Sequence, residues 1–392
     1  MSSHGKVYLT GGGPGDPGLL TVKALQVLKE CDVVVYDALV NPALLENCPP
    51  SAEKIFAGKR RHRHSFEQKE INALLLKYAL EGKKVCRLKG GDPFLFGRGG
   101  EEAEFLSKHG VPFEVVPGIS SIIAVPAAAG IPLTHRDYAS HITVVTGENS
   151  SMKEKAPQDR WEPYGYLQKK TLVILMGFAH TEDIVKRLLT FGWPKDTPIA
   201  LICRGTHADQ LAVSGTLKDF PAKVRRLEGV LGAPGLIVAG AAVGMRGKVS
   251  PSAVDFDFLP LSRLKAHEGV IPERVKKIKE EISAAGVIET PLWVDREHFI
   301  VLNGHHRLAA LKEIGAALVP CVLLDYSSPY IEVRVCEGAK IKSIDKEKVQ
   351  DAALDGKLFP PRSSFHTLRF DPPKVETPVE LLCPGPKRSL KA

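Results

Sequence analysis

The sequence predicts an α/β protein made of two α/β lobes and a smaller C-terminal unit. Short β-branched runs alternate with longer amphipathic runs over the first 250 residues, which is typical of repeated strand–helix units. The alternation restarts near residue 140, so we expect two lobes that join near residues 136–140. A stretch rich in Gly, Lys, Ser and Pro at residues 244–252 indicates a linker to a third unit. The length of 392 residues accommodates two or three domains.

Each expected strand or helix is flanked by glycine-rich or polar residues, which set its limits. In the first lobe we expect strands over 6–9, 32–36 and 84–88, and helices from a Thr21 cap to 30, over 67–81 and over 99–109. In the second lobe we expect strands over 141–146, 171–176, 199–203 and 235–238, with a surface excursion over 150–165. In the last unit we expect a proline-initiated helix over 272–285, a strand over 299–302, a helix over 308–314 ended by Gly315, and a strand over 319–324. The expected divisions are lobes at 1–138 and 139–249, a linker at 250–255, the C-terminal unit at 256–382 and a basic tail at 383–392.

Charge and cysteine content exclude several classes of protein. The net charge of +8 is spread over the whole chain, so it does not predict a protein that coats nucleic acid. A local basic patch that faces an acidic small molecule fits this charge as well. The seven cysteines are odd in number and never spaced as C-x-x-C, which argues against a disulfide framework or a thiolate metal site and favours a reducing cytoplasm. Residues 1–6 are too short and polar for a signal peptide, and the longest uncharged stretch, 115–134, contains three prolines, so we expect no membrane span.

The first glycine loop, residues 13–18, matches G-x-G-x-x-G, and Asp37 follows 19 residues later at a strand end. That spacing is typical of a nicotinamide-binding Rossmann unit. The chemistry excludes it, because a pyrophosphate needs free backbone N–H donors. Pro14 and Pro17 have none, and Asp16 places negative charge where phosphate would sit.

The second glycine loop, residues 89–102, also follows a strand and precedes a helix. Loops of Gly, Pro and Asp suit a cationic, amphipathic ligand better than a phosphate, and S-adenosylmethionine is such a ligand. The alternative, that both loops are merely tight turns, is weaker for two loops than for one.

Several segments occur in the order and spacing of one enzyme family. They are Gly13–Pro17, Tyr36–Val40, Gly58–Arg60 with His64 and Gln68, the second glycine loop, Val116–Ile119, Gly130–Asp137 and Leu175–Gly177. Over residues 5–249 the chain resembles the uroporphyrinogen-III C-methyltransferases. The resemblance implies a homodimer of two-lobed tetrapyrrole (corrin/porphyrin) methyltransferase subunits, with S-adenosylmethionine between the lobes and no Rossmann-type methyltransferase fold.

The resemblance assigns roles to residues that match the family's motifs. It implies contacts to S-adenosylmethionine from Pro14, Gly90, Gly91, Asp92, Leu95, Ser120, Ser121, Met176 and Gly205. It implies Asp37 as proton acceptor and Lys59 as proton donor in the double methylation of uroporphyrinogen III to precorrin-2, the precursor of sirohaem and cobalamin. The chemistry agrees, because carbon methylation must remove a proton from the methylated pyrrole system, and a carboxylate assists that step.

Basic residues near residue 60 suit a substrate that carries many carboxylates. We expect Arg60, His64 and Arg136 to bind uroporphyrinogen III, whereas a solvated basic loop is the alternative for Arg61 and Arg63. Neither His62 nor His64 has partners at metal-ligand spacing, so no metal site is predicted. Two segments depart from the family: residues 203–206 replace Glu-Asn-Gly-Thr, and residues 147–148 replace Gly-His.

Three polar segments of the C-terminal unit together favour a phosphate-handling site. Gly304 lies between an expected strand and helix, so backbone N–H groups there face an anion, and His305, His306 and Arg307 add cationic donors. Residues 264–268 supply the Glu268 carboxylate, and residues 361–366 supply hydroxyls with an Arg and a His.

Residues 256–382 resemble the ParB/sulfiredoxin-like superfamily, a small α+β fold, and more narrowly the free L-serine kinases that form O-phosphoserine from ADP or ATP with Mg²⁺. The matching stretches are 267–268, 304–307, 320–326 and 357–370. The resemblance implies Glu268 as base for the L-serine hydroxyl, residues 304–307 as phosphate cradle, and a substrate clamp of Arg362, Ser363, Ser364 and His366. Asn303 stands where the family often has Asp, and the stretch between 326 and 357 is shorter than in the longer kinases.

The competing interpretation of this unit is a ParB-like nucleotide- or DNA-binding regulatory module. We rank DNA binding lower, because no helix-turn-helix segment is apparent after residue 330.

Overall fold

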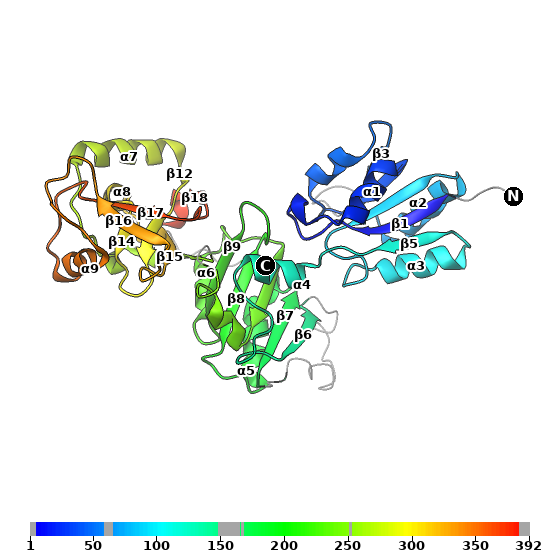
Figure 1. Ribbon diagram of the computed structural model, residues 1–392, viewed down its shortest axis with the longest axis horizontal. Coiled ribbons are helices and arrows are strands. Elements are labelled where there is room, and N and C mark those ends of the chain that lie inside the picture. Colours follow the sequence, from blue (N-terminus) through cyan, green and yellow to red (C-terminus); the bar gives the residue numbers. More distant parts are fainter. Residues whose placement is uncertain (1–4, 59–65, 148–164, 166–167, 251–252, 384–392) are drawn as a thin grey trace.

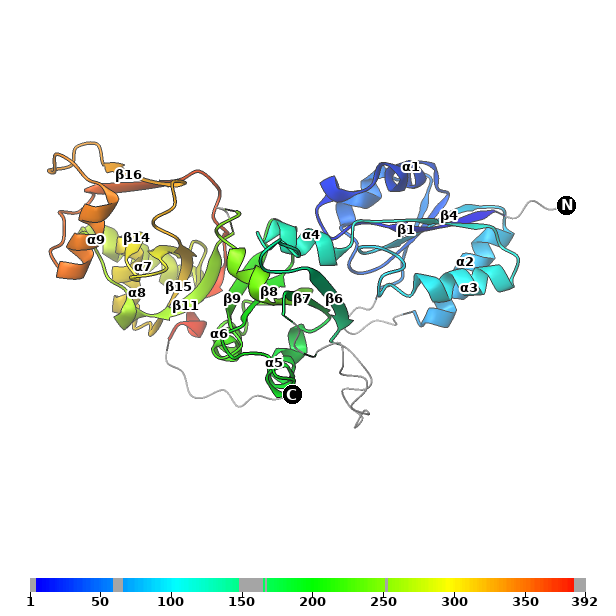
Figure 2. The ribbon, with the colours of Figure 1, turned by 60° about the horizontal axis from the view of Figure 1, so that its bottom comes forward.

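Three α/β units lie in a row in the computed structural model, with the second lobe between the first lobe and the C-terminal unit (Figures 1 and 2). The structure describes residues 5–58, 66–147, 165, 168–250 and 253–383. Most of the surface excursion expected at 150–165 and the basic tail after residue 383 therefore lie outside the described residues.

The first lobe is a five-stranded, all-parallel sheet in the order β3-β2-β4-β1-β5. Its strands are β1 (Lys6–Gly11), β2 (Val33–Tyr36), β3 (Glu53–Phe56), β4 (Lys84–Lys89) and β5 (Phe113–Val116), and its helices are α1 (Val22–Glu30), α2 (Gln68–Leu80) and α3 (Gly99–Lys108). Thr21 caps α1 as expected, since its Oγ1 accepts a hydrogen bond from the Ala24 N–H at 3.2 Å. Because β1 and β4 are neighbours and parallel, the glycine loops that follow them leave the sheet at the same edge.

The second lobe is a mixed five-stranded sheet in the order β6-β7-β10-β8-β9. Its strands are β6 (His141–Thr146), β7 (Lys170–Leu175), β8 (Pro198–Cys203), β9 (Leu211–Thr216) and β10 (Gly235–Ala239), and its helices are α4 (Ser121–Ala128), α5 (Thr181–Thr190) and α6 (Phe220–Arg226). Only β6 and β7 pair in parallel, and the other three pairs are antiparallel.

Helix α4 lies before the expected lobe boundary at residue 138 but packs on the second sheet. Val125 and Ala129 share a hydrophobic core with Val173 and Val238 of that sheet. The packing of the first lobe therefore ends before α4 begins, and α4 spans from the first lobe to the second.

The C-terminal unit contains a four-stranded sheet in the order β11-β15-β13-β14 and two small two-stranded sheets, β12-β18 and β16-β17. Its strands are β11 (Asp255–Pro260), β12 (Val287–Ile288), β13 (Leu292–Asp295), β14 (Val301–Asn303), β15 (Leu318–Leu324), β16 (Ile331–Val335), β17 (Ser364–Leu368) and β18 (Thr377–Pro378). Its helices are α7 (Pro272–Ala285), α8 (His305–Ile314) and α9 (Lys346–Asp355). Between residues 331 and 383, which are all described, α9 is the only α-helix, so no helix-turn-helix pair occurs there.

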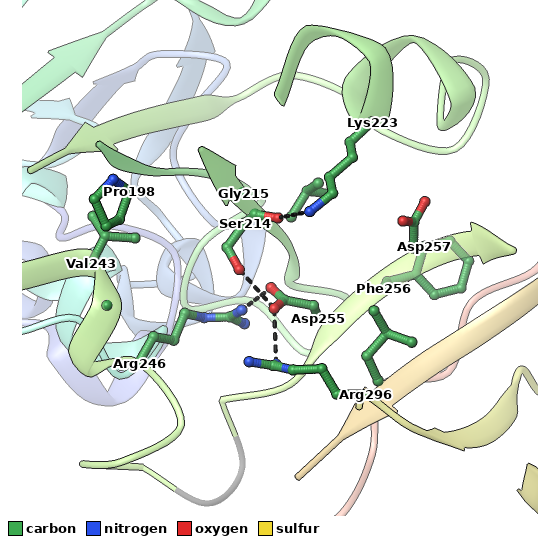
Figure 3. Close-up of a pocket in the computed structure, with 13 residues that line it drawn as sticks. Pro198, Ser214, Gly215, Lys223, Val243, Arg246, Asp255, Phe256, Asp257 and Arg296 are labelled. Atoms are coloured by element: carbon green, nitrogen blue, oxygen red, sulfur yellow. Dashed lines mark hydrogen bonds and ion pairs between the residues drawn. The ribbon is translucent and has the colours of Figure 1, made fainter. Parts of the chain in front are cut away.

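The C-terminal unit packs directly on the second lobe, where β11 lies against the edge strand β9. Between them the buried Asp255 carboxylate pairs with Arg246 and with Arg296 (2.9 Å), and accepts a hydrogen bond from the Ser214 hydroxyl at 2.7 Å (Figure 3). These side chains line a cavity of about 250 Å³. Asp255 was expected in a linker, but it is the first residue of β11 and only 6% exposed.

Candidate functional site

The two glycine loops of the first lobe are hydrogen-bonded to each other. The Gly13 N–H donates to the Gly91 carbonyl at 3.2 Å, and the Gly91 N–H donates back to the Gly13 carbonyl at 2.7 Å. Side chains are excluded nearby, because a Cβ on Gly118 would lie 2.2 Å from the Gly91 oxygen. The glycines therefore allow three backbone segments to converge at one edge of the sheet.

Residues of the second lobe close over this edge. The Asp16 N–H donates to the Thr206 hydroxyl at 3.1 Å, and a Cβ on Gly15 would lie 2.3 Å from the His207 ring. A Cβ on Gly205 would lie 2.4 Å from Val125 of α4. The loops of both lobes thus meet closely, with backbone of the first lobe against side chains of the second.

A cavity of about 1160 Å³ lies between the lobes. The structure brings all nine residues expected to contact the cofactor into its lining: Pro14, Gly90, Gly91, Asp92, Leu95, Ser120, Ser121, Met176 and Gly205. The expected proton acceptor Asp37 also lines it, at the end of β2. Asp92 is fixed in place, because its carboxylate accepts the Phe94 N–H at 2.9 Å and the Gly118 N–H at 3.1 Å.

Asp37 belongs to a buried ion cluster. Its Oδ1 lies 2.6 Å from Arg87 Nη2 and its Oδ2 lies 3.6 Å from Lys89 Nζ. Both cations also contact Glu102 Oε1 of α3, at 3.0 Å from Arg87 Nε and 3.1 Å from Lys89 Nζ. Burial lowers the pKa of the Arg87 guanidinium, but the attraction of Glu102 and Asp37 outweighs it, so that pKa lies above its ordinary value.

Four residues of the cavity lining adopt left-handed backbone without being glycine. They are Phe96, Arg98, Met176 and Arg204, with φ of 53°, 59°, 53° and 47°. Such conformations are costly and cluster at functional sites, where surrounding contacts hold them.

Sequence reasoning missed several charged residues of the cavity. The sequence did contain a signal for Arg87 and Lys89, because two cationic side chains in a strand buried within a parallel sheet require anionic partners. Arg98 and Glu101 also line the cavity and pair with each other at 2.6 Å. Their pairing was readable from the i, i+3 spacing at the start of α3.

Of the residues expected to bind uroporphyrinogen III, only Arg136 lies in the part of the chain that the structure describes. Arg136 is exposed and lies outside the lining of this cavity, so its expected contact with the substrate stays a prediction. Lys59, Arg60 and His64 lie outside the described residues, and so does Glu148.

The sequence profile of the tetrapyrrole (corrin/porphyrin) methylases matches residues 6–221, more than half of the chain. The chain belongs to this methylase family. A uroporphyrinogen-III C-methyltransferase of Methanocaldococcus jannaschii is 49% identical over 242 residues, which is 62% of this chain and 98% of that protein. A siroheme synthase of Acinetobacter baylyi is 48% identical over 242 residues, again 62% of this chain but only 52% of the relative. The chain thus spans about half the length of the siroheme synthases that it matches.

A solved structure shows the same two-lobed fold. The uroporphyrin-III C-methyl transferase of Thermus thermophilus, complexed with S-adenyl homocysteine, is 40% identical with a TM-score of 0.51, covering 62% of this chain and all of that one. The α/β fold expected for residues 5–249 is therefore confirmed.

The cavity of the methylase domain fits S-adenosylmethionine. Convergent glycine backbone leaves room for close approach at one wall, while Leu95 and Met176 present apolar surface and Ser120 presents a hydroxyl. The cavity's volume is at least that of ordinary small-molecule sites, so it is large enough for S-adenosylmethionine.

A second polar cluster lies in the C-terminal unit, around Glu268. Its Oε2 accepts hydrogen bonds from the N–H groups of Ser363 (3.1 Å) and Ser364 (3.0 Å) and from the Ser364 hydroxyl (2.9 Å). Its Oε1 accepts only a longer bond, from the Arg362 N–H at 3.3 Å, and lies 4.0 Å from His305 Nδ1. The sequence-predicted carboxylate, phosphate-cradle and clamp segments therefore meet in space.

Two expected members of the cluster have other partners. The Arg307 guanidinium donates to the carbonyls of Thr290 and Pro291 and to Asn303 Oδ1, so its donors hold the β14–α8 turn. His306 accepts the Ile271 N–H at 3.1 Å. Gly304 adopts φ of 107° and caps α8, which places the first turn of that helix beside Glu268.

Three buried histidines and a tyrosine complete the cluster. His267 lies between the Val301 carbonyl (2.9 Å) and the Ser364 hydroxyl (2.7 Å), and His366 pairs with the Tyr326 hydroxyl at 2.8 Å. Burial lowers the pKa of His267, holds that of His305 well below its ordinary value, and lowers that of His366 to about 3. Tyr326 was missed as a site residue, although it ended one of the segments that carried the resemblance.

We expect the C-terminal unit to lose stability as pH falls below about 6.5, the ordinary histidine pKa. Because burial depresses the pKa of His267, His305 and His366 in the folded chain, the unfolded chain binds more protons in this range. Stability is then lost from about pH 6.5 downward, by up to about 1.4 kcal/mol per pH unit for each histidine. Chemical denaturation between about pH 7.5 and 5 measures this slope. The His366→Gln variant should reduce it, whereas replacement of the exposed His109 should not; equal slopes in all three proteins would contradict the assignment.

Among the described residues, no group of three or more His, Cys, Asp or Glu side chains is placed to hold a metal ion. In the same part of the chain, no helix is both long and apolar enough to cross a membrane.

Proposed function

We propose that residues 5–249 methylate uroporphyrinogen III at two carbons, with S-adenosylmethionine as methyl donor, and release precorrin-2. The observation that carries the proposal is the interlobe cavity, into whose lining all nine expected cofactor residues and Asp37 converge. The 49% identity to a uroporphyrinogen-III C-methyltransferase along almost its whole length supports the same substrate.

In the proposed reaction, bound S-adenosylmethionine supplies a methyl group on a positively charged sulfur. A carbon of the macrocycle attacks that methyl group, the carbon–sulfur bond breaks, and S-adenosylhomocysteine is the leaving group. The methylated ring then loses a proton, for which Asp37 is the acceptor, held at the cavity wall by Arg87 and Lys89. Lys59 is proposed as proton donor, and Arg60, His64 and Arg136 as partners of the substrate carboxylates.

The wild-type chain provides the direct test. Purified protein, uroporphyrinogen III and S-adenosylmethionine are incubated without oxygen, and products are followed by mass spectrometry together with release of S-adenosylhomocysteine. We expect products with one and then two added methyl groups and one S-adenosylhomocysteine released for each. Protein that binds S-adenosylmethionine by calorimetry but methylates nothing would contradict the substrate assignment.

We further propose that the methylase domain forms a homodimer in the cytoplasm. The family resemblance supports the dimer, and the cysteines support the compartment, since all seven are free thiols. Sedimentation of the full chain tests the dimer.

We propose as a second function that the C-terminal unit phosphorylates free L-serine with ADP or ATP and Mg²⁺. The observation that favours it is the convergence on Glu268 of the segments at 304–307 and 361–366. Glu268 Oε1 keeps capacity to accept a serine hydroxyl proton, since the shorter hydrogen bonds are all made by Oε2. The alternative is a ParB-like module that binds a nucleotide without catalysis.

The kinase proposal predicts loss of product on neutralising Glu268. We expect O-phosphoserine from wild type with L-serine, Mg²⁺ and one of the two nucleotides, and a decrease of about 10²–10⁴-fold for Glu268→Gln, because the general base is removed. Mass spectrometry measures the product, and Glu273→Gln, an exposed carboxylate on α7, is the matched control. No product with either nucleotide would leave the binding-module interpretation.

A further inference from the structure

The cluster around Asp37 contains a carboxylate that does not reach the cavity. Glu102 lies on α3, its side chain is fully buried, and it is absent from the cavity lining. Its Oε1 nevertheless accepts from three donors: Arg87 Nε at 3.0 Å, Lys89 Nζ at 3.1 Å and Gln68 Nε2 at 3.2 Å. Two of these donors are the cations that hold Asp37.

The four charges form one balanced unit. Arg87 and Lys89 are only 2% and 4% exposed, so each requires anionic partners to remain buried as a cation. Glu102 contacts both from the protein side, and Asp37 contacts both from the cavity side. Neither cation is available to Asp37 alone, because each also contacts Glu102.

Because Glu102 and Asp37 share Arg87, the orientation of its guanidinium is fixed as well as the balance of charge around it. The Arg87 guanidinium is a rigid fork that points Nε at Glu102, Nη2 at Asp37 and Nη1 at the Val35 carbonyl (3.3 Å). With three of its edges occupied, the guanidinium has one orientation, and the Asp37 carboxylate is aligned against it.

We propose that Glu102 is a positioning residue for the proposed methyl transfer, acting through Arg87 and Lys89 to orient the Asp37 carboxylate and to balance the charge around it. The inference rests on the proposed function, because Asp37 is the proton acceptor only in that reaction. Glu102 itself touches no substrate.

The Glu102→Gln variant changes the charge while keeping the shape. Glu102 Oε2 has no hydrogen-bond partner among the described residues, so a glutamine amide fits there while its oxygen keeps the three donors of Oε1. The cluster then carries one excess positive charge, which stabilises the ionised form of Asp37 and weakens it as a proton acceptor.

We expect Glu102→Gln to lower kcat by about tenfold to a hundredfold, as a small misplacement of a reacting group does. We also expect the acid limb of the pH–rate profile to move down by about one pH unit. The other charged groups lining the cavity are unchanged, namely Glu67, Lys69, Asp92, Arg98, Glu101 and Arg204, with His207, so a shift of the limb reports on Glu102. Glu104→Gln is the matched control, because Glu104 lies on the same helix, is exposed and pairs with the exposed Lys108.

A second variant separates charge from geometry. Glu102→Asp keeps the charge but withdraws the carboxylate from Arg87 and Lys89, so kcat should fall while the acid limb stays near its wild-type position. Affinity for S-adenosylmethionine, measured by calorimetry, and the thermal midpoint of each variant identify any general loss of structure.

The outcomes distinguish this role from the function on which it rests. An inactive wild type overturns the proposed function and the role of Glu102 with it. An active wild type beside a Glu102→Gln variant with unchanged kcat and pH profile overturns the role of Glu102 alone. A variant that loses stability with no shift of the acid limb, or failure of both variants to fold, assigns Glu102 to stability and overturns the proposal.

Discussion

Replacing Asp37 with Asn should reduce methyl transfer by about 10²–10⁴-fold, the range expected when a general base is lost. The substitution keeps the size of the side chain. It also keeps an oxygen in the place of Asp37 Oδ1, which accepts a hydrogen bond from Arg87 Nη2 at 2.6 Å, so the cavity wall keeps its shape. It removes the charge that accepts the proton from the methylated ring. Asp37 is about one-third exposed, at 29%, so the loss should fall on chemistry far more than on folding.

The measurement is single-turnover methylation of uroporphyrinogen III, with S-adenosylmethionine binding followed by calorimetry in the same preparation. We expect binding to be kept, because Pro14, Gly91 and Met176 are untouched. Asp196→Asn, an exposed aspartate in the second lobe, is the matched control. Undiminished methylation by Asp37→Asn would contradict the base assignment.

Local signals in the sequence were sufficient for many elements of the fold. Helix α7 runs from Pro272 to Ala285 as expected, since a proline begins it and Gly286, with φ of 68°, ends it. The strand expected at 299–302 begins instead at Val301, because Phe299 adopts left-handed backbone with φ of 60°. Helix α8 begins at His305 rather than Leu308, because its polar first turn concealed the apolar periodicity.

Tertiary packing determined the features of the fold that local sequence signals did not indicate. Helix α4 precedes the expected lobe boundary, but its Val125 packs into the second sheet, a contact that no periodicity within residues 115–134 indicates. Asp255 follows a linker-like composition, yet it begins a buried strand because Arg246 and Arg296 neutralise it. Both differences arise from pairings between residues distant in sequence.

The candidate site was predictable to the extent that it consists of motifs. Most of the residues expected to contact the cofactor lie on loops marked by glycines and prolines, and all nine line one cavity. The cluster behind Asp37 was not predictable in that way, because Glu102 meets Arg87 and Lys89 only when α3 packs against β4. For Arg136, which is exposed and outside the cavity lining, the substrate-binding role stays a prediction, since a motif specifies residue types and not the direction of a side chain.

The junction between the second lobe and the C-terminal unit contacts one end of helix α4, whose other end lines the methylase cavity. Arg246 pairs with Asp255 and donates through Nε to the Ala129 carbonyl, at the end of α4, at 2.9 Å. The other end of α4 carries Ser120 and Ser121 into the cavity lining. The C-terminal unit therefore contacts, through Asp255 and Arg246, the helix that forms one wall of the cavity.

Replacing Asp255 with Asn should destabilise the chain by about 3–5 kcal/mol, because it leaves the Arg246 guanidinium buried without a counter-charge. Burial raises the pKa of the Asp255 carboxyl, but Arg246 and Arg296 outweigh it and the pKa lies below its ordinary value, so the folded protein favours the ionised form. Asp257 on the same strand is the matched control. Burial raises the pKa of its carboxyl above the ordinary value despite Arg226, so Asp257→Asn should lower the free energy of unfolding far less. Denaturant unfolding of the full chain near pH 7 measures both, and hydrogen exchange should show the loss at β9 and β11. Equal losses in the two variants would mean that burial alone, rather than the ion pairs of Asp255, holds the C-terminal unit on the second lobe.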